Sequence, residues 1–334
     1  MKVLITGAGG FIGSHLVDSQ LEKGNFVRAV DLHVQRLSGV ADHPSLEIVR
    51  GDITDANLAQ ELPKQVEVVY HLASAHLDVS LSNEQYRHVN VGGTLILLEA
   101  AKSAGVRRFV HCSSVGVIGD VERSPADETS PCRPTNIYEQ TKLEGEQAAL
   151  EFARRTGFPV VVARPAWVYG PRCPRTEKLF RAIARRRFPI FGSGRNLRHP
   201  IYVTDAVRGL ELCAQVDQAV GEVYILAGDE PVMVLDLVSI ISQELGVSPP
   251  KLHLPIALGK LAGAALEMAF KPLGRQPPFS KRSVDFFVKH NAYTIDKARC
   301  DLNFHPQVDL RTGIQNTIRL QAGERAGSTH IKHG

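Results

Sequence analysis

A tyrosine and a lysine four positions apart, in "YEQTK" (138–142), have side chains that could move a proton. At this spacing they lie on one face of a helix, a single turn apart. A tyrosine with its ordinary pKa of about 10 is a poor base at neutral pH, but a nearby ammonium group favours the phenolate. Tyr138 could then take the proton of a secondary alcohol while hydride leaves the alcohol carbon. The same spacing also occurs on ordinary helix surfaces, so the surrounding sequence has to decide.

Three glycines near the start of the chain could hold a phosphate group. Gly7, Gly10 and Gly13 follow the strand-like run "KVLIT" (2–6) and lead into a helical segment (12–23). Glycines let the backbone approach a pyrophosphate closely, and a helix N-terminus offers free N–H groups and a positive dipole. In a strand–helix–strand context this pattern predicts a dinucleotide site; the alternative is a tight turn without a ligand.

An aspartate follows at the end of the second predicted strand. The carboxylate of Asp31 can accept hydrogen bonds from the adenosine ribose and would repel a 2′-phosphate, which favours NAD over NADP. Arg36 follows closely and could weaken that preference. The alternative for Asp31 is a simple loop cap.

The elements that must position these residues alternate between strand and helix. Helical segments at 92–104 and 137–156 are interleaved with short β-branched runs at 26–31, 46–52, 66–73, 108–114 and 159–165. This alternation predicts an α/β fold, a Rossmann-type doubly wound parallel sheet with helices on both faces. Serines in "HCSSVGVIGD" (111–120), Tyr138 and Lys142 would then meet at the carboxyl edge of the sheet.

The chain changes character after about residue 170, where Pro and Gly become frequent. We therefore expect a Rossmann domain at 1–170 and a smaller mixed C-terminal substrate lobe at 171–320, with segments such as 200–228 able to return to the first domain. The tail at 321–334 is predicted to be disordered.

Composition excludes several other classes of protein. The chain is 43% hydrophobic and 22% charged, and its formal net charge of +4 is too mild for a nucleic-acid-binding protein. Five scattered cysteines and no signal peptide predict a reduced, cytoplasmic protein without a structural metal. The longest apolar stretch (254–270) is interrupted by Lys260 and Glu267 and is short for a membrane span, so we expect a packed helix there.

The glycine segment "TGAGGFIG" (6–13) resembles the opening of the extended short-chain dehydrogenase/reductase superfamily, which includes NAD-dependent epimerases and dehydratases. The similarity continues in "GDITD" (51–55), "HLAS" (71–74) and "NVGGTLILLEAAKSAGVRRFVHCSS" (90–114), and so covers most of the chain. The resemblance implies NAD as cofactor, a small-molecule substrate and a homodimer formed through the helices at 92–104 and 137–156.

The resemblance also implies roles for individual residues. Tyr138 is the acid/base, Lys142 binds the nicotinamide ribose and lowers the tyrosine pKa, and Ser114 binds the substrate oxygen, with Ser113 as the alternative. Ile118 replaces the tyrosine that is usual in this motif. The implied cofactor contacts are Gly7, Gly10, Phe11, Ile12, Gly13, Asp31, Asp52, Ile53, Leu72, Ala73, Ser74, Asn90, Tyr138, Lys142 and Pro165. Of these, Asn90 could equally have a structural role.

The substrate is less clearly marked. Trp167 stands in "RPAWVYGPR" (164–172), where nucleotide-sugar enzymes commonly place an asparagine that contacts the sugar or diphosphate. The indole would narrow the pocket, stack on a substrate or pack in the core. In the opposite direction, Arg198 aligns with a position that often binds diphosphate. The apolar segment 255–287 resembles the C-terminal part of 3β-hydroxysteroid and sterol dehydrogenase-like members.

Three hypotheses follow. The first is an NAD-dependent oxidoreductase acting on a secondary alcohol or ketone of a bulky, partly apolar, sterol-like substrate. The second is a nucleotide-sugar epimerase or dehydratase that works through a transient keto-sugar. The third, a non-catalytic dinucleotide-sensing protein, has little need for the set of Ser114, Tyr138 and Lys142.

Overall fold

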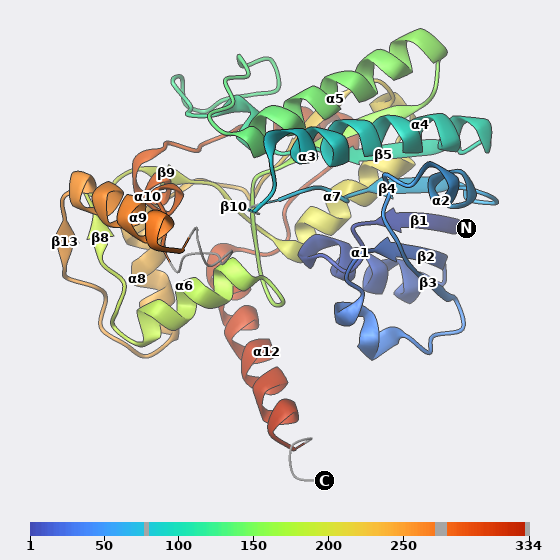
Figure 1. Cartoon of the computed structure of the whole chain (residues 1–334). Helices are drawn as coiled ribbons and strands as arrows, with labels where there is room; N and C mark the ends of the chain where they lie inside the picture. The colour runs from blue at the N-terminus through green and yellow to red at the C-terminus, as the bar shows by residue number, and fades with distance from the viewer. Residues whose placement is uncertain (77–79, 271–278, 331–334) are drawn as a thin grey trace.

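A parallel sheet of seven strands forms the centre of the computed structural model, which describes residues 1–76, 80–270 and 279–330 (Figure 1). The strand order is β11-β6-β5-β4-β1-β2-β3, and every neighbouring pair is parallel. The strands are β1 (Lys2–Thr6), β2 (Phe26–Asp31), β3 (Leu46–Arg50), β4 (Val68–His71), β5 (Arg108–Cys112), β6 (Val160–Pro165) and β11 (Val223–Leu226). This is the predicted Rossmann-type sheet.

Helices cover both faces of the sheet, and its central strands are buried along their whole length. On one face lie α1 (Phe11–Glu22) and α7 (Val203–Gln215). On the other lie α2 (Ala56–Glu61), α4 (Thr94–Ser103) and α5 (Ile137–Thr156), whose apolar side chains pack against Leu4, Val69 and Phe109 (Figure 1).

A π-helical turn, η2 (His88–Gly93), joins the short helix α3 (Asn83–Arg87) to α4. Such turns are rare and frequently lie at functional sites. Here the turn places the buried side chain of Asn90 against helix α5. The sequence predicts a helix from residue 92 but not the irregular turn before it. Three short 3₁₀ turns complete the domain, at Gln35–Val40, Val115–Ile118 and Asp217–Ala219.

The C-terminal lobe, which is predicted to bind the substrate, lies to one side of the sheet and is built from short helices and two-stranded pairs (Figure 1). Its strands are β7 (Trp167–Tyr169), β8 (Ile190–Phe191), β9 (Leu197–Arg198), β10 (Pro200–Tyr202), β12 (Val232–Met233) and β13 (His253–Leu254), paired as β7–β10, β9–β12 and β8–β13. Its helices are α6 (Pro174–Ala184), α8 (Val234–Glu244), α9 (Ile256–Phe270) and α10 (Lys281–Val288).

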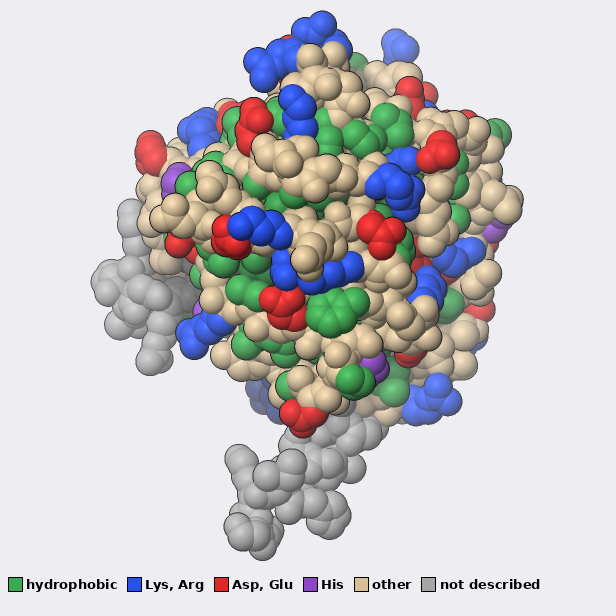
Figure 2. All heavy atoms as spheres, turned by 90° about the vertical axis from the view of Figure 1, so that its right-hand side faces the viewer, with side chains coloured by type: hydrophobic (Ala, Val, Ile, Leu, Met, Phe, Trp, Pro, Cys, Tyr) green, Lys and Arg blue, Asp and Glu red, His purple; other side chains and the backbone are tan. Residues whose placement is uncertain are grey.

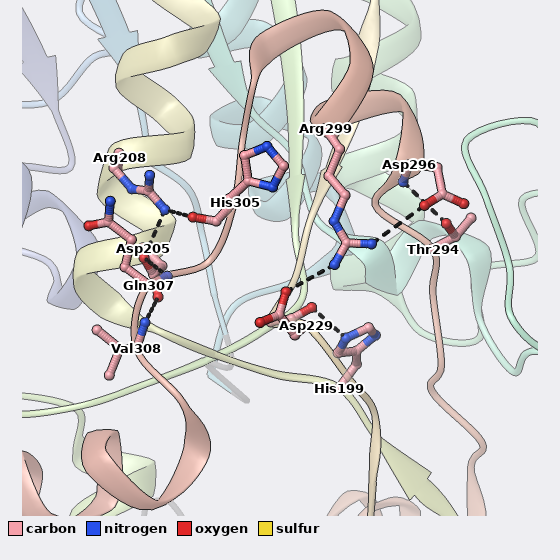
Figure 3. A network of polar contacts seen from close by, with 11 residues as sticks. His199, Asp205, Arg208, Asp229, Thr294, Asp296, Arg299, His305, Gln307 and Val308 are labelled. Carbon is pink, nitrogen blue, oxygen red and sulfur yellow. Dashed lines mark hydrogen bonds and ion pairs between the residues drawn. The ribbon is translucent and has the colours of Figure 1, made fainter.

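After the lobe the chain returns to the sheet through α11 (Asp296–Leu302) before it ends in α12 (Leu310–His330). Figure 3 shows how this return is held: the carboxylate of Asp205 in α7 accepts the backbone N–H groups of Gln307 and Val308, each at 2.9 Å. In the same view Arg299 forms an ion pair with Asp229 at 2.9 Å.

Helix α12 corrects the prediction of a disordered tail from residue 321, because it continues to His330. Once its first turns are ordered, each further residue adds a hydrogen bond without a new nucleus, so the helix extends readily. Residues 331–334 lie outside the described residues, as does the stretch 271–278 of the apolar segment.

The surface shows no field of a single sign on the side of the Rossmann domain away from the lobe, where positive and negative side chains are interspersed (Figure 2). Over the described ranges, no helix is both long and apolar enough to cross a membrane. The same residues contain no group of three or more His, Cys, Asp or Glu side chains suited to a metal ion.

Candidate active site

The glycine loop between β1 and α1 leaves no room for side chains. Gly7 has a φ of 71°, the left-handed region that favours glycine. A Cβ on Gly13 would lie 2.1 Å from the carbonyl oxygen of Gly7, and one on Gly9 would lie 1.7 Å from that of His33. Gly9 is absent from the predicted set, although the doubled glycine at 9–10 marks it.

The N-terminus of α1 is open to a ligand. Its N-cap is Gly10, which provides no side-chain cap for the first amides of the helix, including those of Phe11, Ile12 and Gly13. Such amides together with the helix dipole suit an anion. The close backbone packing and the uncapped helix therefore fit the pyrophosphate of a dinucleotide.

Asp31 lies at the end of β2 and is oriented by the loop. Its Oδ2 accepts the backbone N–H of Gly9 at 3.0 Å, and its Oδ1 accepts that of His33 at 2.9 Å. Asp31 therefore caps the loop, which was the alternative given for it. The same carboxylate could also bind the adenosine ribose, because each oxygen has further lone pairs. Arg36 donates to the carbonyl oxygen of Gly9 at 3.0 Å, so its guanidinium lies against the glycine loop.

The other predicted cofactor residues lie around this loop. A Cβ on Gly7 would clash with the backbone of Leu72 and Ala73. These two residues and Ser74 follow β4 directly. Ile53 is buried against Gly93, and Asp52 accepts the N–H of Thr54 at 2.9 Å. Pro165 ends β6. The structure therefore brings the predicted cofactor residues to the carboxyl ends of β1, β2, β3, β4 and β6.

A chain of buried hydrogen bonds connects the glycine loop to helix α5. The imidazole of His71 lies between the hydroxyls of Thr6 at 2.8 Å and Thr94 at 2.9 Å. Asn90 bonds both backbone groups of Ala75 and donates to the hydroxyl of Thr141 in α5 at 2.8 Å. Its amide is thus occupied by protein groups, which favours the structural role for Asn90. Burial lowers the pKa of His71 to about 3, so the ring is neutral.

The residues predicted to be catalytic lie where β5 ends and α5 begins. Lys142 is 4% exposed, and its Nζ donates to the carbonyl oxygen of Cys112 at 2.5 Å. Burial lowers the pKa of Lys142, while Cys112 and Glu146 act in the opposite direction. Its ammonium therefore lies in a dry environment, where its influence on a neighbouring phenol is stronger than in water.

The two serines differ in their surroundings. Ser114 caps the short turn after β5, where its Oγ accepts the N–H of Gly116 at 3.0 Å. Ser113 is 4% exposed, and its Oγ has no hydrogen-bond partner among the residues that the structure describes. A buried hydroxyl without a partner is unfavourable. Either hydroxyl could therefore receive a substrate oxygen, as predicted.

Two features next to Tyr138 escape sequence analysis. The ring of His76 lies edge-on to that of Tyr138, with centroids 4.5 Å apart. The buried carboxylate of Glu139 accepts the N–H and the hydroxyl of Thr135, both at 2.7 Å, and lies 3.4 Å from the ammonium of Lys289. These hydrogen bonds and Lys289 lower the pKa of Glu139 against the effect of burial. Glu139 belongs to the quoted motif, but no sequence pattern points to Lys289.

Aromatic side chains lie beside Trp167 and Arg198, the residues predicted to bind the substrate. Trp167 in β7 meets Phe286 of α10 edge-on, with centroids 5.8 Å apart, and Tyr169 at 6.0 Å. Arg198 is 7% exposed and donates to the carbonyl oxygens of Asp285 at 2.7 Å and Phe286 at 3.0 Å. Its guanidinium also lies over the Phe286 ring at 4.8 Å. Its donors are therefore directed at α10, and burial lowers its pKa to about 10.

Comparison with known proteins places this geometry in a family. The model of the NAD dependent epimerase/dehydratase family matches residues 3–227. The chain is 34% identical to dTDP-glucose 4,6-dehydratase of Streptomyces griseus, over 95% of this chain and 92% of that protein. It is 28% identical to the decarboxylating sterol-4-alpha-carboxylate 3-dehydrogenase of Mus musculus, over 95% and 90% respectively.

A solved structure is similar over almost its full length. The crystal structure of dTDP-glucose 4,6-dehydratase from Streptomyces venezuelae, which contains NAD, aligns with a TM-score of 0.79 at 26% identity. The alignment covers 98% of each chain.

Proposed function

The chain belongs to the NAD-dependent epimerase/dehydratase family, and from this premise we propose that it oxidises or reduces a secondary alcohol or ketone carbon of a bulky, partly apolar substrate. The family match supports an NAD-dependent enzyme rather than a dinucleotide sensor without catalysis. The sterol dehydrogenase relative supports an apolar substrate.

One observation carries the choice of substrate: the group formed by Trp167, Phe286 and Arg198. A nucleotide-sugar needs free donors for its diphosphate, whereas the donors of Arg198 are engaged by carbonyl oxygens of α10. The surface offered by Trp167 and Phe286 is aromatic and suits a flat apolar body.

The chemistry would be carried by the residues at the end of β5 and the start of α5. Bound NAD supplies the ring carbon that exchanges hydride with the substrate. Tyr138 takes the hydroxyl proton during oxidation and returns it during reduction, and the buried ammonium of Lys142 favours the phenolate that this requires. Ser114 or Ser113 orients the substrate oxygen. Lys142 is 4% exposed, and the exclusion of water around its ammonium strengthens its interactions.

The alternative is a nucleotide-sugar epimerase or dehydratase, which the 34% identity to a dTDP-glucose 4,6-dehydratase supports. Dehydration needs a second proton acceptor and donor besides Tyr138. The loop at 113–119 ("SSVGVIG") carries no ionisable side chain, and the adjacent Glu139 is paired with Lys289. Epimerisation needs no such second pair and is the stronger form of this alternative.

The test is to incubate the protein with NAD and two panels of substrates, hydroxysteroid-like alcohols and UDP- or dTDP-sugars. Net formation of NADH from an apolar alcohol is the expected result. A sugar product without net NADH would establish the alternative, and NAD binding without any turnover would refute both enzymatic proposals.

Two variants sharpen this test. Tyr138→Phe should bind NAD as the wild type does but lose at least about a hundredfold in turnover, since general acid–base catalysis contributes about that much or more. Trp167→Ala should raise KM for the apolar alcohol with a smaller effect on kcat. An unchanged KM would contradict the assigned substrate position. Trp167 is the one tryptophan of the chain, so its fluorescence reports directly on binding.

A further inference from the structure

Helix α9 of the substrate lobe exposes three of its large apolar side chains. Gly259 and Gly263 face inward and are buried. Leu258, Leu261 and Met268 face outward and are 49%, 68% and 73% exposed. A helix that packs on a core normally buries its large apolar residues. Ile256, Leu266 and Phe270 are half-buried, and Ile256 packs against the core, so the sequence prediction of a packed helix at 254–270 is correct for one face of the helix.

The inward glycines have a clear packing reason. A Cβ on Gly259 would lie 2.7 Å from the ring of Phe191 and 3.2 Å from Val284 of α10. Because the glycines let α9 approach these neighbours closely, the helix cannot rotate its leucines into the lobe without losing that contact. The outward apolar face is thus fixed by the packing of the inward one.

The exposed residues form one continuous stripe. Positions 258, 261, 262, 265, 268 and 269 lie on one face of the helix, since each has another of the set three or four residues away; all are apolar and all are exposed. Leu252, just before β13, is 60% exposed and adds to the same end of the lobe. Among the exposed large apolar side chains of the described residues, the three most exposed all lie between 252 and 268.

Exposed basic side chains lie in the same lobe as this stripe. Lys251 and Lys260 are exposed, and Glu267 is the one acidic residue between 251 and 270. The three arginines at 185–187 are also exposed and precede β8, which pairs with β13 through the bond from Ile190 N to Leu252 O at 2.9 Å. In Figure 1, α9 and β13 lie at the end of the molecule farthest from β1.

We propose that this end of the lobe docks on an anionic lipid bilayer, with the stripe of α9 in the interface and the five basic residues at the level of the headgroups. An apolar helix face combined with basic residues is the pattern of peripheral membrane binding. A second copy of the chain fits less well, because a twofold contact would bring the same basic groups against one another. This surface is independent of the proposed substrate.

The experiment is co-sedimentation of the full chain with vesicles of phosphatidylcholine, either pure or with about 30% phosphatidylserine. Binding should be at least about tenfold stronger to the anionic vesicles, since each basic residue near such a surface contributes about fivefold, and it should fall at high salt. No sedimentation with anionic vesicles would overturn the proposal.

Paired variants locate the surface. Leu261→Glu/Met268→Glu should weaken vesicle binding at least about tenfold, because charged side chains would have to enter the interface. Val220→Glu alters an apolar residue that is 41% exposed beside the central sheet, and should leave binding within about twofold. Both variants should keep the wild-type affinity for NAD, which shows that they fold.

Two outcomes would contradict this assignment. If the two variants bound vesicles equally well, α9 would not be the surface that binds the membrane. Conversion of a dimer to a monomer by Leu261→Glu/Met268→Glu, measured by light scattering, would identify the stripe as an interface between copies of the chain.

Discussion

Replacing Arg164 by methionine should destabilise the fold strongly. Arg164 in β6 faces Glu146 in α5, with Nε and Oε2 3.0 Å apart and a second, shorter bond between the same side chains. Their side chains are 5% and 2% exposed. Burial opposes the charge of Arg164, but the bonds and charge of Glu146 outweigh it and raise its pKa. Arg164 also donates to the carbonyl oxygen of Glu128 at 3.3 Å.

The magnitude follows from the charge that is left behind. In Arg164→Met the carboxylate of Glu146 stays buried without its partner, and breaking such a pair costs about 3–5 kcal/mol of unfolding free energy. The double variant Arg164→Met/Glu146→Leu should recover most of this loss, since replacing a whole buried pair by apolar residues is often neutral. Urea denaturation followed by circular dichroism measures both.

The chain provides a matched control. Arg154 pairs with Glu151 on the same helix, at 2.8 Å, but these side chains are 74% and 50% exposed. Arg154→Met should therefore lower the unfolding free energy by no more than about 1 kcal/mol. The reasoning would be refuted if Arg164→Met lost as little as this control, or if the double variant were as unstable as the single one.

Three further predictions concern the site. Gly13→Ala should abolish measurable NAD binding in calorimetry, because its Cβ would lie 2.1 Å from the backbone of the loop. Lys289→Met leaves the charge of Glu139 uncompensated beside Tyr138, so it should raise the pKa seen in the pH profile of kcat/KM for oxidation by about half a unit. Glu139→Gln removes that charge and should lower the same pKa by about half a unit. Shifts of the same sign in the two variants would point to a structural effect alone. The pKa of His71 is lowered to about 3 in the folded state, so its neutral ring contributes stability that is complete above about pH 6.5 and is lost as pH falls. Unfolding free energies at pH 7, 6 and 5 should therefore decline more in the wild type than in His71→Gln, and equal slopes would contradict the assignment.

Much of the fold follows from local sequence. The predicted helix at 137–156 has the bounds of α5, since Asn136 caps its start and Gly157 ends it in the left-handed conformation. The predicted strand at 26–31 has the bounds of β2, because turn residues flank an apolar run. The glycine loop was visible for the same reason: its spacing and its place between strand and helix are both properties of a short segment.

What the sequence could not provide are contacts between distant segments. Lys289 and Glu139 lie 150 positions apart, and neither has a motif that names the other. The environment of Arg198 depends on carbonyl groups of α10, which no side-chain pattern encodes. The exposed face of α9 could not be predicted either, because an apolar helix has the same sequence whether its leucines point inward or outward.

The path of the chain has a consequence for how such enzymes diversify. The polypeptide leaves the sheet after β6, returns through α7 and β11, leaves again, and comes back with α11, where Asp301 accepts a bond from Tyr224 of β11 at 3.2 Å. Recombination at one point would therefore transfer only part of the lobe. To graft the whole lobe of a relative therefore requires two inserts, one on each side of the segment that forms α7 and β11. Such inserts leave the cofactor-binding half of the molecule intact.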